Sequence, residues 1–262
     1  MILRFLGTAQ DGGIPQAGCN CDNCLNYKRT AASIVLLNGS DAVVLDITPD
    51  FRHQWSELSK LYPVELKAIF LTHAHWGHYG GLPLIGKEAW NIKELPLYLS
   101  PSFSRFLQHN EPFKTLITNR NVIIHEINTT KDNIHQVSPI KVPHRQDYTD
   151  TYAFSFTLNG KRVIYVPCVD YFDDDMINSI RTYDLAILDG TFYSDDELPN
   201  RDISKIPHPR VKDSMSKLKD AADKIIFTHM NHSNPIISPN NSQRIELESM
   251  GFRVAEDGLE IE

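Results

Sequence analysis

A short apolar run that leads directly into three histidines is the feature that most constrains this chain. Residues 68–71 read as a buried strand. His73 and His75, two positions apart, leave its end on one side, and His78 follows on a turn. Neutral imidazoles bind zinc, iron or manganese, and three of them in one short turn hold a divalent ion at little cost in chain entropy. A solvated histidine-rich loop needs neither the apolar run before it nor the Gly-Gly turn after it, so the pattern favours a metal site.

A second cluster of metal-binding side chains lies near the N-terminus. Cys19, Cys21 and Cys24 follow the spacing C-x-C-x-x-C, which brings three thiolates around one ion and leaves a tetrahedral site one ligand short. Three free thiols in a loop are the other interpretation, which is disfavoured because exposed, clustered thiols are prone to oxidation. His232 is the natural fourth partner, because it stands three residues beyond His229 and cannot easily face the same ion. We therefore expect a structural Cys3His zinc site.

Composition and charge limit the class of protein. The 262 residues are 41% hydrophobic and contain no linker-like stretch, so a single domain over residues 1–262 is expected. The formal net charge of -7 offers no electrostatic footprint for a nucleic-acid backbone, so no nucleic-acid partner is expected. The first apolar segment is too short for a signal peptide, and no run approaches the roughly 18 apolar residues that span a bilayer. Clustered cysteines fit a metal site in a reducing compartment, so we expect a cytoplasmic protein without membrane contact.

Several further apolar runs end in a side chain that can bind a metal ion or a proton. They are Asp46 in strand 41–47, His144 after strand 136–142, Cys168 with Asp170 after strand 161–167, Asp189 in strand 185–189, and His229 in strand 224–229. Asp46 could instead cap the helix that follows it, and Cys168 could be a buried structural cysteine. The loop 7–15 is rich in glycine but lacks the GK[ST] of a P-loop, which favours a tight turn beside the site.

The segment THAHWGHYGGL resembles the HxHxDH signature of the metallo-β-lactamase-fold hydrolases, with Gly77 where that family carries Asp. The resemblance implies an α/β fold, a four-layer αββα sandwich with metal ions at one edge of its sheets. It implies a first ion held by His73, His75 and His144, and a second, weaker ion held by His78, Cys168 and His229. Asp170 is the alternative to Cys168, and Asp46 orients the ligands from behind. The missing carboxylate at position 77 removes a charge and lowers metal affinity.

The C-terminal half resembles the transfer-RNA 3′-processing nucleases. It carries DGTF after a strand, then His208 before a predicted helix 211–222, then a strand that ends in Thr-His. In those enzymes the histidine at this point assists protonation of the leaving group, which makes His208 a candidate general acid and places Asp189 with it among the catalytic residues. A loop histidine between two prolines is the other interpretation.

Four segments together resemble the coenzyme PQQ synthesis protein B branch of the same superfamily. They are LGTAQDGGIPQAGCNCDNC, VLDITPDFRHQ, ILDGTFYSDDE and THMNHSNP. The branch implies a metal-bound protein of PQQ biosynthesis that acts oxidatively on a precursor or carries the product. The Cys3His zinc site, which would link the first loop to the last strand, is similar to that of the phosphonate-degradation phosphodiesterases.

The predicted function is a metal-dependent hydrolase that acts on a small phosphodiester or related ester through a metal-bound hydroxide. One or two zinc, manganese or iron ions are expected at the histidine site, with a small-molecule substrate and a homodimer as one expected state. An iron-dependent oxygenase or a carrier in PQQ biosynthesis is the alternative. A third hypothesis is a non-catalytic binding protein that is stabilised by the Cys3His ion alone.

Overall fold

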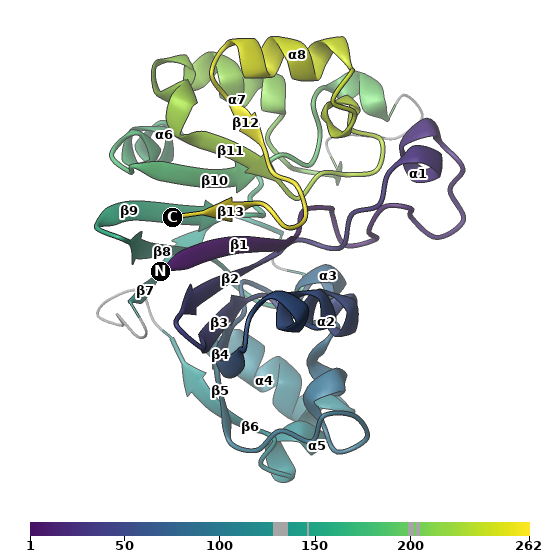
Figure 1. The fold of residues 1–262 in the computed structure, drawn as a ribbon, viewed down its shortest axis with the longest axis vertical. Helices are drawn as coiled ribbons and strands as arrows, with labels where there is room; N and C mark the ends of the chain where they lie inside the picture. The colour runs from purple at the N-terminus through teal and green to yellow at the C-terminus, as the bar shows by residue number, and fades with distance from the viewer. Residues whose placement is uncertain (128–135, 146, 199–201, 203–204) are drawn as a thin grey trace.

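Two mixed β-sheets form the centre of the protein (Figure 1). The computed structural model describes residues 1–127, 136–145, 147–198, 202 and 205–262. In these residues one sheet has the strand order β13-β1-β2-β3-β4-β5-β6 and the other β12-β11-β10-β9-β8-β7. The strands of the first sheet are β1 (Ile2–Gly7), β2 (Ser33–Asn38), β3 (Asp41–Leu45), β4 (Glu65–Phe70), β5 (Leu95–Leu99), β6 (Val122–Glu126) and β13 (Glu260–Ile261). Those of the second are β7 (Val137–Val142), β8 (Thr151–Leu158), β9 (Lys161–Val166), β10 (Leu185–Asp189), β11 (Ile225–Thr228) and β12 (Arg253–Val254).

Helices cover the outer face of each sheet (Figure 1). The first sheet is covered by α2 (Phe51–Leu61), α3 (Trp76–Tyr79), α4 (Pro101–His109) and α5 (Phe113–Thr118). The second is covered by α6 (Asp174–Arg181), α7 (Val211–Lys217) and α8 (Ser242–Ser249). Buried apolar side chains accordingly form three clusters, one beneath each helical layer and one between the sheets. This arrangement confirms the predicted four-layer αββα sandwich.

The strands read as continuous apolar runs because each sheet is buried on both faces. In β4, Ala68 and Phe70 point into the core between the sheets, whereas Ile69 packs beneath the helices. Successive side chains of a strand alternate between faces, so an apolar run serves two cores at once. A helix at this place could not send alternate residues into the two cores. Residues 68–70 lie in β4, as the apolar run predicts.

Strand direction places the chemically active ends at a common edge. β3 and β4 are parallel, and β1 runs in the same direction because it is separated from β3 by the antiparallel β2. In the second sheet β9, β10 and β11 are parallel, and β7 shares their direction across the antiparallel β8. The carboxyl ends of strands from both sheets thus deliver their following residues to one rim.

One local prediction needs correction. The helix predicted over 211–222 ends at Lys217 and continues as a 3₁₀ helix, Lys219–Lys224, because the kink lets Leu218 and Ala222 both enter the core beneath α8. The last two strands of the chain, β12 and β13, join different sheets. A short helix, α1 (Asp22–Asn26), carries the last cysteine of the N-terminal cluster. Among the described residues, the helices lack the combined length and apolar character that a membrane-spanning segment requires.

Candidate metal sites

The histidines of the central motif meet a fourth histidine at the rim. His73 and His75 follow β4, and His144 follows β7 of the other sheet. Nδ1 of His75 lies 2.9 Å from Nε2 of His73 and 3.3 Å from Nε2 of His144. Nitrogen ligands about 2.1 Å from a tetrahedral ion lie roughly 3.4 Å apart, so these separations suit three ligands of one cation. The three nitrogens belong to a group whose ligand atoms lie within 4.8 Å of one another.

Two of the three ligand imidazoles are oriented by a partner on the other side of the ring. Nδ1 of His144 lies 2.8 Å from the carboxylate of Asp170, which also accepts a hydrogen bond from the backbone N–H of Arg145. Nδ1 of His73 lies 3.0 Å from the hydroxyl of Thr72. Partners of this kind fix the tautomer that leaves the opposite nitrogen lone pair available to a metal. Asp170, predicted as the alternative to Cys168 among the ligands, therefore lies behind an imidazole.

A second group of ligand atoms lies beside the first, around His78. Its Nε2 is 3.5 Å from Oδ1 of Asp11, and Nε2 of His229 is 3.7 Å from the same oxygen. Sγ of Cys168 lies 3.6 Å from Nε2 of His229. The clusters of possible ligands include Asp11 with His78 and His229, and Cys168 with His73 and His78. The structure thus brings the predicted trio of His78, Cys168 and His229 to one place and adds a carboxylate to it.

Asp46 lies behind the ring of His78, on the side away from Nε2. Its carboxylate lies 2.7 Å from Nδ1 of His78 and accepts hydrogen bonds from the backbone N–H and hydroxyl of Thr72. Asp46 has a φ of 68° and His229 a φ of 60°, so both side chains are directed by the left-handed backbone region. Non-glycine residues rarely adopt this region, and the packing around the rim must stabilise it.

Burial favours the neutral form of most rim histidines. It lowers the pKa of His73 well below its ordinary value, lowers the pKa of His75 and His229, and lowers the pKa of His144 to about 2. Burial also lowers the pKa of His78, but the carboxylates of Asp46, Asp11 and Asp189 together outweigh it and the net shift is upward. A neutral imidazole keeps the lone pair that a metal requires.

Two buried polar atoms at the rim have no hydrogen-bond partner. They are Nε2 of His78 and Oδ1 of Asp11, which face each other at 3.5 Å. A buried polar atom without a partner costs free energy, and a cation between these two atoms would satisfy both. Imidazole, carboxylate and thiolate groups are ligands of zinc and its neighbours among the divalent metals, so the residues present fit such an ion.

His208 and Asp189, the two predicted catalytic residues, form a pair next to the metal ligands. Nδ1 of His208 lies 2.7 Å from the carboxylate of Asp189, and both side chains are buried. Asp189 also accepts hydrogen bonds from Thr191, whose hydroxyl lies 2.9 Å from Nδ1 of His229. Burial raises the pKa of Asp189, but His208, His229 and Thr191 together have the larger effect and lower it to about 2, so the carboxylate is ionised. The ring of His208 lies 5.4 Å from that of His144, which puts it beside the first metal group.

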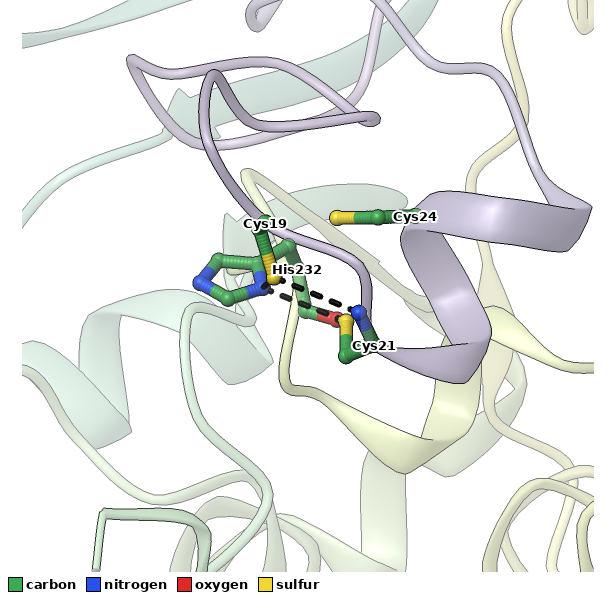
Figure 2. A group of neighbouring side chains, drawn as sticks. All are labelled: Cys19, Cys21, Cys24 and His232. Carbon is green, nitrogen blue, oxygen red and sulfur yellow. Dashed lines mark hydrogen bonds between the residues drawn. The ribbon is translucent and has the colours of Figure 1, made fainter.

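The cysteine cluster lies apart from the rim ligands, with His232 as its fourth member (Figure 2). Sγ of Cys19 and Sγ of Cys21 each lie 3.4 Å from Nδ1 of His232. Cys24 reaches in from α1, and the four ligand atoms lie within 4.8 Å of one another. Burial raises the pKa of Cys24 to about 11, since a lone thiolate there would be poorly solvated. The four side chains expected to form the Cys3His site thus lie together.

Asp11 is the rim residue that the sequence reasoning missed. It follows β1, in the loop 7–15 that the sequence predicts to be a tight turn beside the site. The available signal was strand direction, because β1 runs parallel to β3 and so ends at the edge where Asp46 lies. The turn itself is present, since the backbone N–H of Gly13 bonds to the carbonyl of Gln10.

A family model, curated sequences and solved structures all match this chain. The β-lactamase superfamily domain model matches residues 41–230. Coenzyme PQQ synthesis protein B of Acinetobacter baumannii (strain ACICU) is 26% identical over 310 residues, covering 100% of both chains. The crystal structure of Zn2+-bound PqqB from Methylobacterium extorquens is similar with a TM-score of 0.86, 24% identity and full coverage of both chains. A diphosphatase of the PhnP family is similar with a TM-score of 0.73 and 25% identity, covering 99% of this chain and 96% of its own.

Proposed function

The chain belongs to the β-lactamase superfamily, and from that premise we propose that it is a metal-dependent hydrolase of small phosphodiesters or related phosphate esters. The observation that carries the proposal is the convergence of Nε2 of His73, Nδ1 of His75 and Nε2 of His144 beside the Asp189–His208 pair. A structural role alone would not need a cation site and an oriented imidazole within reach of one another.

Divalent ions at the rim would act as Lewis acids and supply a nucleophilic water at neutral pH. The protein side chains hold and orient the other participants. The carboxylate of Asp189 accepts a hydrogen bond from Nδ1–H of His208. This bond fixes the ring and leaves Nε2 of His208 free to exchange a proton with a leaving group. Asp170 and Asp46 hold two ligand imidazoles in the tautomer that metal binding requires.

A cleft of about 530 Å³ opens beside His208 and gives room for a small substrate. Its walls include Asp170, Tyr171, Arg210 and Lys217. The guanidinium of Arg210 is held by Asp195 and contacts the ring of Phe192. A guanidinium in the wall of the cleft that His208 lines suits a phosphate group, because guanidinium N–H groups match its oxygens. The similarity to a PhnP-family diphosphatase supports the same substrate class.

Hydrolysis of bis-p-nitrophenyl phosphate tests the proposal. Protein loaded with zinc or manganese is expected to release p-nitrophenol, and the His73→Ala variant is expected to lose that activity together with rim metal. Replacing exposed His53 on α2 by alanine serves as the matched control and should change neither. A fully metal-loaded wild-type protein that cleaves no phosphate ester would contradict the proposal.

A second candidate is a role in PQQ biosynthesis, as a metal-dependent oxygenase or a carrier. It is favoured by the relatives named coenzyme PQQ synthesis protein B, which match over the whole chain. This function predicts a single iron at the rim and oxygen uptake with a PQQ precursor, or binding of PQQ without turnover. Elemental analysis of purified protein, combined with an oxygen electrode, separates it from the hydrolase.

A further inference from the structure

Gly77 cannot carry a side chain in this structure, because Asp11 fills the space beside it. A Cβ placed on Gly77 would lie 2.6 Å from Cα of Asp11 and 2.9 Å from its Cβ, and it would be closer still to Oδ1. Real Cβ atoms do not approach other heavy atoms this closely. The carboxylate that the HxHxDH signature would place at position 77 is thus replaced in space by one from the loop after β1.

The carboxylate of Asp11 is aimed at two imidazoles. Oδ1 lies 3.5 Å from Nε2 of His78 and 3.7 Å from Nε2 of His229, and the two imidazole rings are stacked with centroids 5.2 Å apart. Both distances are too long for good hydrogen bonds, yet Oδ1 is buried without another partner. Three ligand atoms around an ion have such separations, because each is bonded to the ion and none to another.

The backbone holds Asp11 in this position independently of its side chain. The N–H of Gln10 bonds to the carbonyl of Met230 at 2.9 Å, and the N–H of Met230 bonds to the carbonyl of Thr8 at 2.9 Å. Asp11 therefore follows a residue that is tied to the neighbour of His229. A ligand set on a fixed backbone loses little entropy when the ion binds.

We propose that Asp11, together with His78 and His229, is a ligand of the second rim ion, in place of the carboxylate absent at Gly77. The carboxylate of Asp11 supplies the negative charge that is missing at Gly77, so binding of the second ion does not depend on Cys168 alone. Two imidazoles and one carboxylate suit zinc, manganese and ferrous iron. The inference rests on the proposed function only in that both require a metal at the rim.

Metal content and affinity of Asp11 variants test the assignment. Asp11→Asn keeps the size of the side chain and removes its charge, whereas Asp11→Gly removes it entirely. Both are expected to lose one equivalent of zinc or manganese on gel filtration, or to bind it at least about 10-fold more weakly in a chelator competition. Asp41→Asn, an exposed carboxylate at the other end of β3, is the control and should retain wild-type metal content.

The double variant Asp11→Gly/Gly77→Asp asks whether a carboxylate at position 77 can stand in for Asp11. A Cβ at position 77 would still lie 2.6 Å from Cα of residue 11 after the Asp11 side chain is removed, so this variant is expected to stay one equivalent of metal short, as Asp11→Gly does. Wild-type occupancy and affinity in both Asp11→Asn and Asp11→Gly would overturn the proposal. Wild-type protein that binds two rim ions and loses one in the Asp11 variants, but cleaves no phosphate ester, would leave this assignment standing and remove the proposed function.

Discussion

The contribution of His232 to stability can be estimated from its distance along the chain. Cys19, Cys21 and Cys24 lie close together in sequence, so even the unfolded chain offers zinc three thiolates. His232 lies 213 residues from Cys19, and bringing it to the ion in an unfolded chain costs about 5 kcal/mol by the loop-closure relation (3/2)RT ln n. In the folded protein the ring already lies beside two of the thiolates (Figure 2). Zinc therefore gains its fourth ligand only in the folded state.

The substitution His232→Ala removes this difference between the folded and unfolded states. A ligand stabilises the folded state by the excess of its affinity for that state over its affinity for the unfolded chain. We expect the free energy of unfolding with zinc to fall by up to about 5 kcal/mol. The thermal midpoint should fall by roughly 10–20 °C, at the usual scaling of 2–4 °C per kcal/mol for chains near this size.

Urea unfolding of wild type and His232→Ala, each with saturating zinc and with chelator, gives a four-point thermodynamic cycle. The two proteins should differ with zinc and converge when the ion is removed. His53→Ala, a change at an exposed histidine of α2, should match wild type in both conditions. An equal difference between wild type and His232→Ala in chelator would refute the reasoning, because the imidazole would then stabilise by packing and not by binding zinc.

Four further substitutions test the rim and its separation from the cysteine cluster. Asp46→Asn removes the charge behind a ligand imidazole, so rim metal affinity should fall about 10–100-fold in a chelator competition, with the fold unchanged by circular dichroism. Asp189→Asn should lower kcat by about 10²–10⁴-fold with a smaller effect on KM, because His208 loses the carboxylate that orients it. Cys21→Ser and His73→Ala should each remove a different ion in elemental analysis, and loss of the same ion in both would contradict the separation of the two sites.

The fold could be predicted because the side chains of each central strand pack into two hydrophobic cores, which makes the strand apolar along its whole length. Runs such as 68–71 are apolar on both faces, and polar ligands stand where those runs end, so strand positions and rim candidates emerge together. The helix break at Leu218 could not be predicted from propensity. It depends on which residues meet the core under α8, and tertiary packing decides that.

Asp11 shows the limit of reading ligands from a motif. Nothing in residues 72–82 indicates where a replacement for the carboxylate at Gly77 would come from, since the loop that supplies it is positioned by backbone bonds to Met230. His229 was identified because it ends a strand. Asp11 lies four residues beyond β1, where a glycine-rich turn hides the strand-end signal.

Two segments distant in sequence, residues 8–24 and 228–234, supply ligands to both metal clusters. Met230 exchanges two backbone hydrogen bonds of 2.9 Å with the loop after β1, and these bonds involve no metal. They fix the register between the segments, so that His229, before Met230, meets the rim carboxylate while His232, two residues beyond it, meets the thiolates. Because this pairing already sets both geometries, neither ion is needed to form the other site. The clusters should therefore bind their ions independently, and the cysteine cluster should act on stability while the rim acts on chemistry.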